Sequence, residues 1–160
     1  EISRTVQQED LLMTYPALLF PPEIAAAVEM RESTNGMEIW DPIRKKWLVA
    51  VPEEWVRQHC IVYLEALGFP KSNMTTEAGI QTGFKQKRTD IVATKAGKPI
   101  ILVECKAPAV KLSQATFNQA FNYNQSVDAA YLWLTNGKQH LYWDCTANTP
   151  CHSLPLAESV

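Results

Sequence analysis

The stretch from residue 88 to residue 106 reads RTDIVATKAGKPIILVECK and predicts two neighbouring β-strands. β-Branched and aliphatic residues dominate both halves, and the Ala-Gly turn between them folds one strand back alongside the other. Side chains two apart on a strand face the same way, so Glu104 and Lys106 emerge together, and the turn brings the strand that carries Asp90 beside them. The sequence therefore predicts two carboxylates and one ammonium group on adjacent strands.

Two carboxylates and a lysine suit a Mg²⁺-dependent site that cleaves phosphodiesters. Asp90 and Glu104, with the carbonyl of Cys105 as a third oxygen, would hold one or two ions against the scissile phosphate. Lys106 would orient the attacking water and assist its deprotonation. The pattern leaves one alternative open, in which Glu104 and Lys106 lie on a solvent-facing strand edge whose apolar residues turn inward.

The length and composition are typical of an ordinary globular protein. A chain of 160 residues is long enough for one domain with a real core, and 46% apolar with 20% charged residues argues against wholesale disorder. No apolar stretch approaches the roughly 20 residues that span a bilayer, and we expect no signal peptide and a cytoplasmic location. No C-x-x-C pair occurs, so we expect four reduced thiols: Cys60, Cys105, Cys145 and Cys151.

The charge distribution says more than the net charge of −2. Seven basic and two acidic residues lie between Lys85 and Lys111, so this segment carries +5 and the rest of the chain −7. We interpret the segment as a basic surface around the two carboxylates, with Lys85, Lys87 and Arg88 as residues that bind a nucleic-acid backbone. The competing interpretation is a solvated hairpin whose lysines blunt a sheet edge.

Local signals predict the remaining elements. Pro52 opens a helix that Gly68 closes, with carboxylates in its first turn. Ser113 is a good N-cap for a second helix that runs to about Asp128. In the first helix we expect Trp55, His59, Val62, Tyr63 and Ala66 to face the core, with His59 a packed histidine rather than a ligand. We expect further strands over residues 76–82, 88–94, 100–105, 131–135 and 140–143.

The first fifty residues allow two interpretations. Side chains alternate along Ala26–Arg31, with Ala26, Val28 and Met30 on one side, and a turn follows at residues 33–36. This pattern predicts a hairpin. The double proline at 21–22, followed by alanines, favours a short helix instead. A third strand is expected over Trp47–Val51. We divide the chain into an N-terminal extension packed on the core (1–50), a core (51–145) and a C-terminal tail (146–160).

Five separated motifs in this order resemble the N-terminal nuclease domain of type I restriction enzyme R subunits, and most closely its small stand-alone members: Pro52–Gln58, Lys87–Ile91, Leu102–Pro108, Gln119-x-x-x-Tyr123-Asn124 and Leu134–Gly137. That family belongs to the PD-(D/E)XK nuclease superfamily. The resemblance implies an α+β (α/β) fold of restriction-endonuclease type, with a mixed central β-sheet flanked by helices and the N-terminal β-hairpin as an extension. Thr89 stands where the superfamily name has proline.

The resemblance also implies roles for single residues. Asp90 and Glu104 match the two metal carboxylates and Lys106 the catalytic lysine. Glu54 matches a glutamate that completes the metal site in many members, although Glu53 is an equally placed candidate. Gln119 and Tyr123 match an element associated with positioning DNA and the active site.

These features together predict a Mg²⁺-dependent deoxyribonuclease, with Mn²⁺ as a substitute ion. The alternative is a catalytically silent nuclease-fold module that binds DNA or protein. R subunits also carry a helicase motor, but no P-loop occurs in this sequence, so we expect no ATP site and no translocation by this chain. The expected partners are DNA and other restriction or DNA-processing subunits, with no membrane. The sequence does not indicate an oligomeric state.

Overall fold

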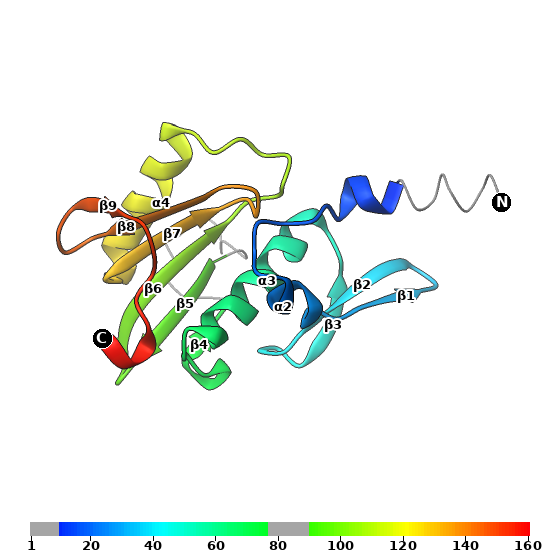
Figure 1. The fold of residues 1–160 in the computed structure, drawn as a ribbon, viewed down its shortest axis with the longest axis horizontal. Coiled ribbons are helices and arrows are strands. Elements are labelled where there is room, and N and C mark those ends of the chain that lie inside the picture. The colour runs from blue at the N-terminus through cyan, green and yellow to red at the C-terminus, as the bar shows by residue number, and fades with distance from the viewer. Residues whose placement is uncertain (1–9, 77–89) are drawn as a thin grey trace.

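The structure is a computed structural model that describes residues 10–76 and 90–160, and at Asp90 the backbone alone (Figure 1). Three predicted DNA-binding residues therefore lie outside the described residues: Lys85, Lys87 and Arg88. The strand expected over residues 76–82 also lies outside them, except for its first residue. Within them no helix is long and apolar enough to cross a membrane.

A six-stranded mixed sheet forms the centre of the fold. Its order is β4-β5-β6-β7-β8-β9, and all neighbours are antiparallel except β6 and β7, which the helix α4 connects as a parallel pair. The expected strands over 88–94, 100–105, 131–135 and 140–143 are confirmed to within three residues at each end. The strands are β4 (Met74–Thr75), β5 (Asp90–Lys95), β6 (Lys98–Cys105), β7 (Tyr131–Thr135), β8 (His140–Asp144) and β9 (Thr149–Cys151).

Two helices cover opposite faces of this sheet, and both begin where the sequence predicts. The helix α3 (Pro52–Ala66) starts at proline and ends before Gly68, whose φ of 101° suits glycine. The helix α4 (Gln114–Val127) starts from a capping box in which the Ser113 hydroxyl accepts a hydrogen bond from the backbone N–H of Thr116. One core cluster lies under α3 and a second under α4.

The N-terminal region combines both interpretations of its sequence. The double proline starts a short helix, α2 (Pro22–Ala26), and a three-stranded antiparallel sheet follows, made of β1 (Met30–Ser33), β2 (Gly36–Asp41) and β3 (Lys46–Val49). Figure 1 shows α3 between this sheet and the central one, and α3 contacts β2 as well as β5 and β6. The fold is therefore the predicted α+β fold with a mixed sheet, helices and an N-terminal β extension.

The position of α3 between two sheets corrects the predicted core face of that helix. The fully buried residues of α3 in the central core are Val56, Cys60, Ile61 and Leu64. Of the predicted residues, Tyr63 packs against this core and is partly buried, whereas Ala66 is exposed. A single apolar stripe describes a helix with one buried face, but α3 is buried on two sides. His59 is a packed histidine, as expected, with its Nδ1 2.7 Å from the carbonyl oxygen of Trp55.

Both terminal segments pack on the core. Phe20 lies among the rings of His59, Tyr63, Trp133 and His140. At the other end, β9 extends the sheet, Leu154 is buried, and a 3-10 turn, η2 (Ala157–Ser159), follows. A second such turn, η1 (Lys71–Asn73), follows α3. All four cysteines are free thiols, as predicted.

Candidate active site

Glu104 and Lys106 lie together at the carboxyl end of β6. Lys106 Nζ is 3.3 Å from Glu104 Oε1, and the side chains are 23% and 2% exposed respectively. Leu102 packs in the cluster under α4, so Glu104, two residues further along the strand, faces the same side of the sheet. The backbone N–H of Lys106 donates to the carbonyl of Thr135 at 2.8 Å, which holds this strand end against β7. The structure therefore pairs a buried carboxylate with a partly exposed ammonium.

The register of β5 against β6 sets Asp90 directly opposite Glu104. The pairing continues through Ile91 opposite Val103 and Val92 opposite Leu102, before a shift between Ala93 and Thr94. Register is strongly specified where a strand has a buried face, because a slip of one residue would turn its apolar side chains outward. The backbone thus brings the predicted positions Asp90 and Glu104 together as neighbours on adjacent strands.

Glu53 and Glu54, neighbours in the first turn of α3, have different surroundings. Burial raises the pKa of Glu53; the charge of Lys106 lowers it and that of Glu104 raises it, so Glu53 lies within electrostatic range of that pair. Glu54 forms an ion pair with Arg57 one turn further along the helix, and its Oε2 accepts a hydrogen bond from Gln58 Nε2 at 3.4 Å. Glu53 thus interacts electrostatically with the Glu104–Lys106 pair, and Glu54 is held by Arg57 and Gln58.

Arg57 and Gln58, for which the sequence predicts no role, are both 2% exposed. Among the described residues no hydrogen bond is found for Arg57 Nε or Nη1. The ion pair with Glu54 is therefore the main interaction that offsets the burial of the Arg57 charge. The spacing of Glu54 and Arg57 could have revealed the pair, since residues three apart on a helix are neighbours. Their burial could not be read from that spacing, because it depends on the N-terminal sheet.

The helix α4 presents Gln119 and Tyr123 one turn apart. Gln119 is exposed and Tyr123 is half-buried against the cluster under α4. Since Glu104 faces the same side of the sheet as this cluster, α4 is the helix that covers its face. The predicted role of Gln119 and Tyr123 in positioning DNA and the active site stays a prediction.

Two lysines of the predicted basic surface, Lys95 and Lys98 at the β5–β6 turn, lie away from Glu104. Lys85, Lys87 and Arg88 of that surface lie outside the described residues. Lys98 begins β6 six residues before Glu104, which at about 3.3 Å per residue places them about 20 Å apart along the strand. Lys95 Nζ donates to the carbonyl oxygens of Ala157 and Val160 at 2.5 and 2.6 Å. Of these three lysines, Lys106 alone lies beside Glu104.

Chemically, the site offers acidic oxygens from two elements and one cation at the end of a strand. Among the side chains that the structure describes, which exclude that of Asp90, no three of the metal-ligating types gather around one point. Carboxylates from Glu53 and Glu104 are nevertheless the oxygen donors that Mg²⁺ prefers, and the backbone adds Asp90 at the neighbouring position. The donor set fits a hard divalent cation.

The fold and site define an α+β domain whose mixed sheet ends in a carboxylate–lysine pair. A family model described as the type I restriction enzyme R protein N terminus matches residues 52–155, more than half of the chain. The chain belongs to this family, and with it to the nuclease modules of restriction systems. No curated protein and no solved structure matches it. The matched range begins at α3, so the α2–β3 region lies outside it.

Proposed function

We propose that this chain is a Mg²⁺-dependent DNA nuclease domain that hydrolyses phosphodiester bonds through Asp90, Glu104 and Lys106. The observation that carries the proposal is the end of β6, where a buried carboxylate and an ammonium group lie 3.3 Å apart. The register of β5, which brings Asp90 opposite Glu104, supports it further. A catalytic lysine must reach solvent and substrate, and Lys106 is the exposed member of its pair.

Asp90 and Glu104 would hold Mg²⁺, or Mn²⁺ in its place. Glu53 would be a further ligand rather than Glu54, because Glu54 is held in its ion pair with Arg57. When bound, the ion would neutralise phosphate charge and activate water. Lys106 would orient the water and stabilise the charge that develops on the phosphate. The apolar interior below Glu104, which includes Leu102 and Leu134, would keep bulk water away and strengthen these interactions.

DNA binding forms the second part of the proposal. Lys85, Lys87 and Arg88 would neutralise backbone phosphates, and Gln119 and Tyr123 on α4 would position the strand near Glu104. Such contacts carry no sequence information by themselves, so recognition of particular sites would depend on partner subunits of the restriction system.

A catalytically silent binding module is the second candidate function. The ion pair with Lys106 would offset the buried charge of Glu104 also in a protein that binds no metal, so this pair is compatible with a module without chemistry. This candidate keeps DNA or protein binding and predicts no turnover.

A cleavage assay separates the two candidates. Purified protein is incubated with supercoiled, linear and single-stranded DNA with Mg²⁺ or Mn²⁺, beside Asp90→Ala and Lys106→Ala. Metal-dependent cutting by the wild type that both variants lose would support the nuclease. Absence of cutting on every substrate, with DNA binding retained in all three proteins, would establish the silent module instead.

A further inference from the structure

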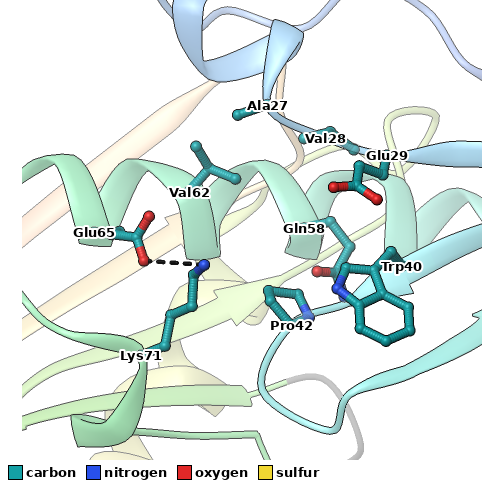
Figure 2. A pocket seen from close by; sticks show the side chains of 9 residues that line it. All are labelled: Ala27, Val28, Glu29, Trp40, Pro42, Gln58, Val62, Glu65 and Lys71. Carbon is teal, nitrogen blue, oxygen red and sulfur yellow. Dashed lines mark ion pairs between the residues drawn. The ribbon is translucent and has the colours of Figure 1, made fainter.

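A small pocket lies where the N-terminal region meets α3, outside the candidate active site. Its volume is about 120 Å³, and its walls come from the segment after α2, from β2, from α3 and from η1. Figure 2 shows Glu29, Gln58 and Trp40 at one end and the Glu65–Lys71 ion pair at the other. Trp40 and Glu29 precede the range that matches the family model, so the pocket depends on a region outside that match.

The polar groups that line this pocket are mostly acceptors. Glu29 is exposed. Glu65 forms an ion pair with Lys71, in which Oε2 and Nζ lie 3.3 Å apart and both side chains are 46% exposed. Gln58 is 2% exposed and donates its Nε2 hydrogen to Glu54, which leaves its carbonyl oxygen as an acceptor. Two carboxylates against one ammonium give the lining a net negative charge, which favours a cation with several N–H donors.

The size of the pocket limits its occupant to one side chain. Pockets for drug-sized ligands or cofactors measure roughly 300–1,000 Å³, several times this volume. A pocket of single-side-chain size, with an aromatic wall, is typical of an anchor site in a protein interface, where arginine is enriched. A guanidinium group presents five N–H donors in one plane and stacks on indole rings, which matches the acceptors and Trp40.

We propose that this pocket binds an arginine side chain of a protein partner. The carboxylate of Glu29 would pair with the guanidinium, Gln58 would accept one N–H, and Trp40 would stack against its plane, all at the end of the pocket opposite to the Glu65–Lys71 ion pair. The negative lining disfavours the phosphates of nucleic acid, so the pocket would serve protein assembly rather than DNA binding. The proposal does not depend on catalysis.

The test is an NMR titration of the indole N–H resonances, with that of Trp40 identified from Trp40→Phe. The probes are N-acetyl-arginine amide and its neutral isostere N-acetyl-citrulline amide. We expect a saturable shift of the Trp40 resonance with the arginine probe, with a dissociation constant on the order of 1–10 mM, and at least fivefold weaker binding of the citrulline probe.

Variants test whether the shift of the Trp40 resonance results from binding in this pocket. Glu29→Gln should weaken arginine binding at least fivefold, whereas the matched control Glu23→Gln, at an exposed glutamate of α2 that does not line the pocket, should leave it unchanged. Asp90→Ala should bind like the wild type, so failure of the nuclease proposal would not affect this result. The proposal is overturned if the Trp40 resonance does not shift saturably, if citrulline binds equally well, or if a 5′-phosphorylated dinucleotide occupies the pocket in preference to arginine.

Discussion

Two carboxylate–cation pairs lie near the junction of α3 and β6, and they differ in the exposure of the cation. In the Glu104–Lys106 pair the carboxylate is buried while the lysine is 23% exposed. In the Glu54–Arg57 pair both partners are secluded, with side chains 11% and 2% exposed. The ammonium group of Lys106 is therefore accessible to a ligand from solvent, whereas the guanidinium of Arg57 is not.

This difference in exposure distinguishes a pair that can act in function, Glu104–Lys106, from a pair that stabilises the fold, Glu54–Arg57. Removing one partner of a closed pair leaves a charge in a poorly solvated environment, so a closed pair is expected to affect stability. An open pair retains access to solvent and is expected to affect function. The Glu65–Lys71 pair on the surface provides a third case, in which both charges remain solvated and little energy is at stake.

The largest expected effect is on stability, at the closed pair. Arg57→Ala should lower the free energy of unfolding by about 3–5 kcal/mol, because it leaves Glu54 buried without its cation. Urea denaturation followed by circular dichroism measures this, and Lys71→Ala is the control, with an expected loss below about 1 kcal/mol. Equal losses in the two variants would show that the Glu54–Arg57 pair is not structural.

At the open pair the main effect should be on activity. Lys106→Gln keeps a hydrogen-bond donor near Glu104 but removes the charge, and we expect metal-dependent DNA cleavage to fall about 100-fold, or ~2.7 kcal/mol in the barrier. Initial rates at saturating metal measure the change, and denaturation should show a smaller stability loss than Arg57→Ala. A variant that cuts at the wild-type rate would rule out a role for Lys106 in the chemistry.

The two neighbouring glutamates of α3 allow a finer comparison. Glu53→Gln should reduce cleavage about tenfold with little effect on folding, since Glu53 interacts electrostatically with Lys106 and Glu104. Glu54→Gln should instead lower stability, because it removes the charge that faces Arg57. The paired rate and denaturation measurements test both, and the opposite pattern would make Glu54 the residue of the active site.

The smallest expected effect is a pH dependence of the free energy of unfolding, which arises from His59 and His140. Both histidines contact the N-terminal segment at Leu19 and Phe20. Burial lowers the pKa of His140, which the hydrogen bond to the Leu19 carbonyl partly opposes, and burial likewise lowers the pKa of His59. The unfolded chain therefore takes up these protons first, and the free energy of unfolding should fall as pH decreases below about 6.5.

Trp133 makes this prediction specific to His140. Its indole N–H donates to His140 Nδ1 at 3.2 Å, while His140 Nε2 lies 2.7 Å from the Leu19 carbonyl oxygen. The Thr135 hydroxyl also lies 2.8 Å from His140 Nδ1 and can donate to it. The neutral Nε2–H form therefore satisfies all three contacts, whereas a proton on Nδ1 would oppose the indole N–H. Denaturation at pH 7.5 and 5.5 should show a smaller pH difference for His140→Gln than for the wild type, and an unchanged or larger difference would contradict the assignment.

Much of the fold could be predicted because its signals are local. Pro52 and Gly68 bound α3, and the side chain of Ser113 caps α4, so sequence neighbours alone decide where these helices begin and end. The core face of α3 could not be predicted, because it depends on a second sheet that only the folded chain brings into contact. The docking of Phe20 depends equally on contacts with residues far along the chain.

For the candidate site, the strand positions could be predicted and the helix contribution could not. Alternation along β6 sets Glu104 and Lys106 on one side, and the short turn sets Asp90 opposite. Whether Glu53 or Glu54 points to them depends on the rotation of α3, since adjacent helical residues differ by about 100°. The packing of α3 between the two sheets decides that rotation, and no local pattern encodes these contacts.

Binding of Mn²⁺, followed by the loss of its free electron paramagnetic resonance signal, tests the central claim most directly. We expect the wild-type protein to bind the ion, Asp90→Asn and Glu104→Gln each to weaken binding at least tenfold, and folded Glu54→Gln to bind like the wild type. Binding that is unchanged in Glu104→Gln, or lost in Glu54→Gln alone, would contradict a metal site at the end of β6.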